Sequence, residues 1–464
     1  MSSTILLKGG TILTHNEDGK VVSKVADLLI QDSIIQDIAE GLSITGGTTI
    51  DCAGKIVSPG FIDTHHHTWQ TQLRGVHAND TLLDYFHAGN FMSTFYTSDD
   101  AFWADEAIKA TIASGIRSIF AYTPTTRVAT WKPEFQLDHN SLAPWVMETW
   151  DRLAASNPFG PNGRVQLGFA FDGMYLPDKL LQDLFGKVRA QGSHLITTHA
   201  VNCSMFNTHT IAKLSSCDLL GPDILLSHAN NMSSEELNLL RKVGAHISAT
   251  PSTELQMGHG DPVCMDALDC SSLGVDCHSA CSSFMPTQMM LALQTGRAER
   301  HRKFHGAGKW PNSIGHKVED AFNLGTILGA KAIGLDKQIG SLQKGKKADI
   351  VIFEGTTSNM VAVSERDPVA AIVLHSSVRD VSTVIVDGVV RKRDGQLLKV
   401  NVPQNIGPDA EAGPSYSWSD IAREITKGMR VLEDSKSHSY DPEVAREGII
   451  AAFHMDRSSA ADHV

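Results

Sequence analysis

Residues 59–67 read Pro59-Gly60-Phe61-Ile62-Asp63-Thr64-His65-His66-His67. An apolar run behind a Pro-Gly break predicts the end of a buried β-strand that presents imidazoles. His65 and His67 are two positions apart, so on a strand they project from one face and can bind one cation together, whereas His66 faces the other way. Neutral imidazole suits zinc or iron, and a metal site that keeps a position for water is a hydrolytic one.

The chain between residues 58 and 335 alternates strand-like and helix-like stretches, which is typical of a parallel α/β barrel. Residues 195–199 and 224–228 are short apolar runs that each end in a histidine, and residues 273–276 end in an aspartate. Residues 233–236 (Ser-Ser-Glu-Glu) predict the capped start of a helix of about ten residues that ends near Gly244.

The two ends of the chain share a different pattern. Short β-branched runs separated by turns occupy residues 5–56, and the same pattern returns after Gly340, so both ends are expected to form one sheet module. The predicted units are residues 1–57 and 336–403 in that module, 58–335 in the barrel and 404–464 in a helical tail.

The tail has two helix signals. Ser419-Asp420 is expected to cap a helix whose apolar residues recur at helical spacing, and Asp441-Pro442 is expected to begin a second. Both helices are expected to pack on the barrel or on a neighbouring subunit, so the protein is expected to be a homo-oligomer.

The composition limits the kinds of partner. The chain has 464 residues with 42% hydrophobic content and a formal charge of −12, which argues against a nucleic-acid or anionic-membrane surface and favours a small-molecule partner. Its first residues do not read as a charged start followed by a long apolar run, and no later apolar run approaches about 18 residues, so neither secretion nor membrane insertion is expected. Its seven cysteines contain no Cys-x-x-Cys pair. We therefore expect a cytoplasmic protein with reduced thiols.

Polar candidates follow several of the predicted barrel strands. In a parallel barrel the carboxyl ends of the strands converge, so these side chains are expected to meet there. They are His65, His67, His199, His228 and Asp276. Three histidines and a carboxylate would bind one divalent metal and leave a position for water, whose pKa the metal lowers toward about 7.

These motifs resemble the amidohydrolase superfamily, and within it the metal-dependent aminohydrolases and chlorohydrolases of the cytosine-deaminase and triazine-hydrolase type. The resemblance covers nearly the whole chain to about residue 400 and implies an α/β fold, a TIM-like (β/α)8 barrel with a small composite β-sandwich domain. It is carried by residues 59–67 with Gln70 and Arg74-Gly75, by residues 226–230 with 234–237, by 329–335 and by 339–349.

The resemblance also implies roles for the candidates. His65, His67, His199 and Asp276 would hold the metal, His228 would polarise the substrate, and Asp276 would also accept a proton from water. No lysine lies between positions 132 and 179, where relatives with two metals carry one, so one zinc or iron ion per chain is expected.

The fifth-strand motif departs from the family pattern. Deaminases of this type read His-x-x-Glu, whereas this chain has Asn202 in the last position, and an amide cannot titrate. Glu254 is a hypothetical replacement for the missing acid. The substrate is expected to contact Trp69, Gln70 and Arg74 on the loop after the first strand, together with Asn202.

The leading prediction is metal-dependent hydrolysis of a non-peptide carbon–nitrogen bond, by deamination or amide opening, in a heterocyclic or aromatic small molecule. Two alternatives stay open. The same metal site would serve dechlorination, dehydration or another elimination, or an inactive barrel would serve binding or assembly.

Overall fold

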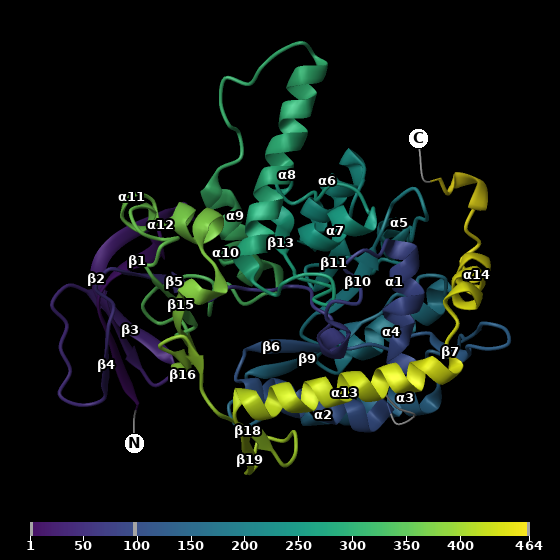
Figure 1. The fold of residues 1–464 in the computed structure, drawn as a ribbon, viewed down its shortest axis with the longest axis horizontal. Helices are drawn as coiled ribbons and strands as arrows, with labels where there is room; N and C mark the ends of the chain where they lie inside the picture. The colour runs from purple at the N-terminus through teal and green to yellow at the C-terminus, as the bar shows by residue number, and fades with distance from the viewer. Residues whose placement is uncertain (1–2, 96–99, 462–464) are drawn as a thin grey trace.

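The structure, a computed structural model, describes residues 3–95 and 100–461 and contains two sheets flanked by helices (Figure 1). One sheet collects strands from both ends of the chain, and the other is formed by the middle of the chain. None of the helices in these ranges is long and apolar enough to cross a membrane.

The first sheet has nine strands in the order β17-β16-β15-β14-β5-β1-β2-β3, with β4 paired to β1. Its amino-terminal strands are β1 (Thr4–His15), β2 (Val21–Gln31), β3 (Ile34–Ala39), β4 (Thr48–Asp51) and β5 (Lys55–Pro59). Its carboxy-terminal strands are β14 (Ile350–Glu354), β15 (Val381–Val386), β16 (Val389–Arg393) and β17 (Gln396–Leu397). The antiparallel pairing of β14 with β5 joins the two ends, as the shared sequence pattern predicted.

The second sheet is parallel and has the order β13-β12-β11-β10-β9-β6. Its strands are β6 (Ser118–Tyr122), β9 (Val165–Ala170), β10 (Ile196–Ala200), β11 (Ile224–His228), β12 (His246–Ala249) and β13 (Ser271–Leu273). All five residues of β11 are buried, which is typical of a strand inside a parallel sheet. Two hairpins lie outside the sheets, β7 (Arg127–Thr130) with β8 (Gln136–Asp138), and β18 (Val400–Pro403) with β19 (Ala412–Tyr416).

The expected eight-stranded closed barrel is not assigned in the described residues, and the expected first strand at residues 61–67 is not a strand. This segment does run beside β13, where Thr64 N donates to Leu273 O and Asp276 N donates to His65 O. Its earlier amides, however, donate to other parts of the chain, Gly60 N to Asp349 O and Ile62 N to Gly325 O. Because its hydrogen bonds are divided among three partners, no continuous ladder forms.

Helices precede and connect the strands of the parallel sheet. They are α1 (Leu82–Ala88), α2 (Asp100–Ser114), α3 (Pro144–Ser156), α4 (Asp178–Ala190), α5 (Thr210–Ser216), α6 (Ser234–Val243) and α7 (Pro251–Met257). The expected capping box and stop of α6 are confirmed, because Ser233 and Glu236 cap its start and Gly244 ends it in a left-handed conformation. Beyond β13 follow α8 (Met285–Gly306), which projects from the body (Figure 1), then α9 (Val318–Leu324), α10 (Ile327–Ala332), α11 (Val363–Arg366) and α12 (Pro368–Ala370).

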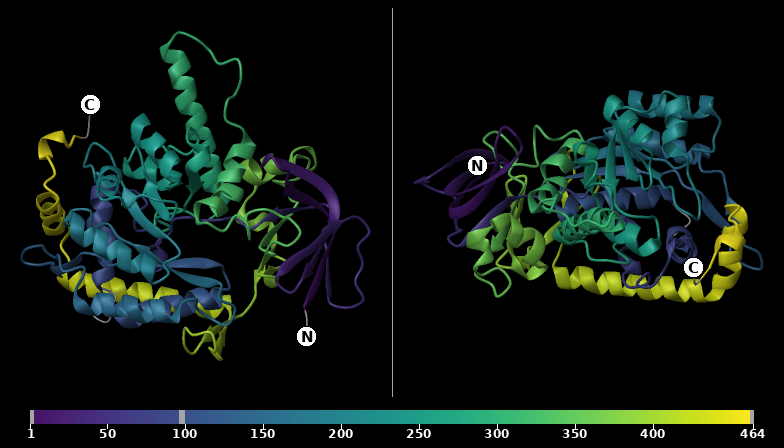
Figure 2. Two further views of the ribbon diagram at one scale, coloured as in Figure 1. Left: turned by 180° about the vertical axis from the view of Figure 1, so that it is seen from behind. Right: turned by 90° about the horizontal axis from the view of Figure 1, so that it is seen from above.

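The tail forms the two expected helices, α13 (Trp418–Ser439) and α14 (Pro442–Ala452), and α14 lies beside α1 (Figures 1 and 2). The predicted cap at Ser419 is wrong by two residues. Ser417 accepts from the amide of Asp420 and completes a capping box, because Ser417 is the last extended residue before the helical backbone begins. Asp441 caps α14 as predicted.

Candidate metal centre and active site

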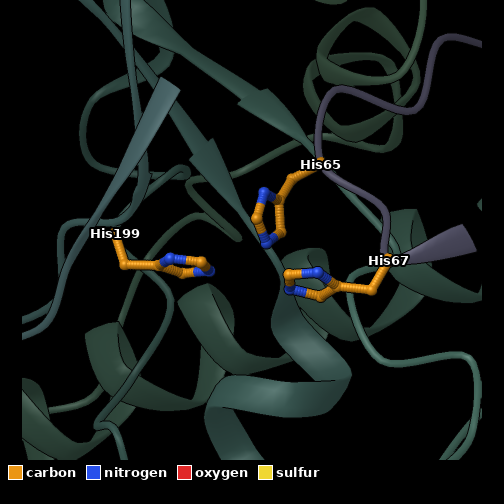
Figure 3. Close-up of side chains that lie close together, drawn as sticks. All are labelled: His65, His67 and His199. Atoms are coloured by element: carbon orange, nitrogen blue, oxygen red, sulfur yellow. The ribbon is translucent and has the colours of Figure 1, made fainter. Parts of the chain in front are cut away.

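The predicted metal ligands converge at the carboxyl ends of the parallel strands. Figure 3 shows the rings of His65, His67 and His199 turned toward one another, with centroids 4.8 Å apart for His65 and His67 and 5.0 Å apart for His65 and His199. The ligand atoms of these three lie within 4.8 Å of one another, and the same holds for His65, His228 and Asp276. The five residues singled out from the sequence therefore form one cluster.

Asp276 lies at the centre of this cluster. Its Oδ1 is 3.2 Å from Nε2 of His65 and 3.0 Å from Nε2 of His67, and its Oδ2 is 3.9 Å from Nε2 of His228. Burial opposes its ionisation, but the contacts with His65 and His67 outweigh burial and hold its pKa well below the usual range. The centre therefore holds a carboxylate in contact with several imidazoles.

The backbone at this point is unusual. Asp276 has φ of 61° and His228 has φ of 71°, a left-handed conformation that is uncommon for residues other than glycine. Such conformations persist where the surrounding structure enforces them, often at functional sites. Next to Asp276, Gly274 is required by space, because a Cβ there would lie 2.8 Å from the Cβ of His65.

The outer nitrogens of three of these histidines have partners. Nδ1 of His65 lies 2.8 Å from Ser227 Oγ, Nδ1 of His199 lies 2.8 Å from Asp172 Oδ2, and Nδ1 of His228 lies 3.0 Å from Thr250 Oγ1. Each ring therefore has its Nε2 left for the centre, which is the arrangement of imidazoles that bind a metal.

The cluster fits a divalent metal ion. Nε2 of His65 is buried without a hydrogen-bond partner among the described residues, and it faces the Asp276 carboxylate. Several imidazole nitrogens and one carboxylate are the donor set that zinc takes in catalytic sites. His65, His67, His199 and Asp276 are the residues that would hold such an ion.

Two residues of the site were not among the predicted site residues, although the sequence had already indicated His259 as a plausible neighbour of the metal ligands. Asp172 follows β9 closely, and its Oδ1 also accepts from the backbone amide of His199 at 2.9 Å. Because Asp172 follows an apolar strand, as several predicted ligands do, this position in the sequence could have indicated it.

His259 lies after α7 and is only 3% exposed, and its ring centroid is 4.7 Å from that of His228. Burial lowers the pKa of His259 to about 4, and neither ring nitrogen has a partner within the described structure.

A cavity of about 260 Å³ opens beside the cluster. Its polar end is lined by His67, Asp172, His199, His228, His259 and Asp276. Apolar side chains, described below, line the other end. The cavity gives a small molecule access to the candidate metal centre.

The four expected substrate contacts are not among the described residues that line this cavity. Gln70 is buried beneath it, where its Nε2 donates to the Tyr85 hydroxyl at 2.6 Å. Trp69 packs in a neighbouring apolar cluster, Arg74 is exposed, and Asn202 Nδ2 donates to the carbonyl of Asn231 at 3.2 Å. A direct role of these residues in substrate binding remains a prediction.

Glu254 lies in α7 behind His228 and is fully buried. Its Oε1 accepts from the amide of Thr250 at 2.8 Å and lies 3.4 Å from Nδ1 of His228. Burial raises the pKa of Glu254 to about 8, so the carboxyl is largely protonated at neutral pH. Since Glu254 is not among the residues lining the cavity, its contact with a substrate would run through His228.

Comparison with known proteins supports the same chemistry. The family model described as the Amidohydrolase family matches residues 188–391, a span that contains His199, His228 and Asp276. The chain therefore resembles the amidohydrolase superfamily, and the family model matches the part of it that holds three of the candidate residues. This confirms the resemblance seen in its motifs.

Relatives match this chain over most of its length. It is 26% identical to the 5'-deoxyadenosine deaminase of Methanobrevibacter smithii, over 86% of this chain and 95% of that protein. It is 25% identical to the 5-methylthioadenosine/S-adenosylhomocysteine deaminase of Acetivibrio thermocellus, over 86% and 96%. An adenosine deaminase from Xanthomonas campestris with bound zinc shares its fold, with a TM-score of 0.70 and 14% identity over 93% of this chain and 98% of that one.

Proposed function

We propose that this protein is an amidohydrolase that deaminates an amino-substituted heterocycle of the adenine-nucleoside type, with one zinc or iron ion per chain. The family assignment and the relatives named as deaminases support a hydrolase that acts on a carbon–nitrogen bond other than a peptide bond. The observation that carries the proposal is the convergence of three imidazoles and the Asp276 carboxylate at the end of a small-molecule cavity.

The fold proposal is a (β/α)8 barrel in which residues 61–67 run beside β13. The hydrogen bonds between Thr64 and Leu273 and between His65 and Asp276 support this arrangement. It accounts for the position of His65 and His67 next to Asp276, although they are more than 200 residues apart in the chain.

The residues that line the cavity have different roles in the proposed reaction. A bound divalent metal would lower the pKa of a water molecule and so supply a nucleophile near neutral pH. Asp276 is ionised and is placed to accept the proton of that water and return it to the departing amine. His228 directs its Nε2 to the same place, and burial keeps it neutral by lowering its pKa. His259 has free ring nitrogens that can hydrogen-bond the heterocycle.

We assign Glu254 to the positioning of His228 rather than to proton donation. Its Oε1 and Thr250 Oγ1 both lie near Nδ1 of His228, so together they favour a proton on that nitrogen. Glu254→Gln keeps a carbonyl oxygen for this contact and is expected to retain most activity. Glu254→Leu is expected to lower kcat about 10- to 100-fold while the metal content stays unchanged. Loss of turnover in Glu254→Gln, with metal retained, would instead identify Glu254 as the proton donor.

Metal content and ammonia release test the function. Protein purified without added metal is expected to carry about one zinc or iron ion per chain, since the two metal-compatible groups share His65 and form one cluster. With 5'-deoxyadenosine or adenosine it is expected to release ammonia. A strong chelator should remove both the metal and the activity and lower the melting temperature, and added zinc should restore all three.

The other outcomes separate the alternatives. One metal without ammonia from any amino-heterocycle would contradict deamination and favour elimination or dechlorination at the same site. Protein that binds no metal even after reconstitution would contradict catalysis and favour a binding role.

A further inference from the structure

The cavity has an apolar end that the proposed chemistry does not use. It is lined by Leu82, Tyr85, Phe86, Phe206, Met257, Cys277 and Phe453. Cys277 Sγ lies 3.5 Å from Asp276 Oδ1, and Cys277 packs in one buried cluster with Tyr85 and Met257, against which Phe86 and Phe206 also pack. The apolar surface therefore runs without interruption from beside the candidate metal centre to Phe453.

Three phenylalanines close this end. The ring of Phe453 stacks on Phe86, with centroids 5.2 Å apart and planes 23° apart, and it lies 6.4 Å from Phe206. Phe86 and Phe206 are 5.8 Å apart. These separations are those of packed aromatic side chains. Phe453 is nevertheless 37% exposed, so part of its ring is not covered by the protein.

Phe453 comes from the helical tail, beyond residue 391 where the family match ends. The tail is docked by several contacts. Ala445 and Ile449 of α14 are fully buried, and Arg446 lies 3.7 Å from Asp84 of α1. A side chain at Gly448 would come within 2.4 Å of Phe135, so the helix approaches the hairpin β7–β8 closely. Docking of α14 thus places Phe453 at the cavity.

We propose that Phe453 determines specificity, and that with Phe86 and Phe206 it binds a compact apolar group which the substrate carries beyond its reacting heterocycle. This inference rests on the proposed function, because the heterocycle must occupy the histidine end. A cavity of about 260 Å³ is smaller than most ligand sites, which span roughly 300–1,000 Å³. It therefore suits a group of methyl or methylthio size better than a long one, and its walls favour that group over a hydroxyl.

Steady-state kinetics of the full-length, metal-loaded Phe453→Ala variant test the inference. With methylthioadenosine its KM is expected to rise about tenfold, with kcat nearly unchanged, while the KM for adenosine changes by less than about twofold. Phe453→Leu keeps apolar bulk and should restore most of the loss. Trp418→Ala, at the exposed start of α13, is the matched control and should leave both substrates unaffected. An unchanged ratio of the two KM values in Phe453→Ala would overturn the inference while the proposed function stands.

A binding measurement keeps the test independent of turnover. In calorimetric titrations the wild-type protein is expected to bind phenylimidazole more tightly than imidazole, because the phenyl ring reaches the apolar end. In Phe453→Ala the ratio of the Kd for imidazole to the Kd for phenylimidazole should fall about tenfold. The metal content and melting temperature of this variant should match those of the wild type. A wild-type protein without this preference would overturn the inference even if it deaminates nucleosides. Failure of every heterocycle to release ammonia would contradict the proposed function, and the titration would still decide the role of Phe453.

Discussion

Asp276→Asn is expected to lower kcat/KM about 1,000-fold and to reduce the metal content well below one ion per chain. The asparagine keeps the size of the side chain but loses the negative charge that lies 3.0–3.2 Å from two imidazoles. Without this charge a divalent cation loses its anionic ligand, and the water loses its proton acceptor. Metal analysis and ammonia release on the same preparation measure both effects.

Asp269→Asn is the matched control. Asp269 precedes the same strand, β13, but its exposed carboxylate pairs with Arg241 at 2.8 Å on the surface. Such exposed pairs contribute about 0–1 kcal/mol, so activity and metal content should remain at wild-type values. An Asp276→Asn protein that keeps both its metal and its activity would remove Asp276 from the mechanism.

His228→Gln is expected to lower kcat by about 100- to 10,000-fold while the metal content stays at the wild-type value. His228 is buried, its Nδ1 contacts Thr250, and its Nε2 faces Asp276, so the ring is placed to act on substrate and water. Glutamine fills a similar volume but cannot present an imidazole nitrogen at that point. Asp276→Asn is expected to lose both metal and activity, whereas His228→Gln is expected to lose activity alone. Measuring metal content and kcat for both variants therefore distinguishes a catalytic role of His228 from a metal-binding role.

His246→Gln controls for the loss of a histidine in the neighbouring strand. His246 begins β12, opposite Leu225 of β11, and thus lies toward the other end of the sheet from His228. Its replacement should leave kcat unchanged. If His228→Gln loses its metal together with its activity, His228 is a ligand, as its presence in one of the two metal-compatible groups allows.

The ligand positions were accessible from the sequence because each follows a local pattern. His199 and His228 end short apolar runs, and in a parallel sheet such ends lie together regardless of the loops between them. The start and end of α6, the helix after β11, were predicted for the same reason. Ser233, Glu236 and Gly244 fix these ends through contacts within a few residues. The helical tail was predicted for the same reason, with an error of two residues at its cap.

Long-range packing decided the features that the sequence could not show. Residues 60–67 read as the end of a strand, but their hydrogen bonds go to three distant segments. Gln70 is expected to contact the substrate from the loop after the first strand, and the sequence could not show that Tyr85 and Ser279 hold its side chain in the interior. Glu254 reads as a free acid near the site, yet it lies behind His228.

The sequence by itself therefore determined the chemistry of this protein, namely a cluster of imidazoles and one carboxylate at the ends of parallel strands. Residue type and local spacing are sufficient for that. Only the tertiary structure decided which side chains form the cavity, because Asp172, His259 and Phe453 are brought to it by elements far apart in the chain. Their positions depend on how helices and loops pack, and packing is a property of the whole fold rather than of any local pattern.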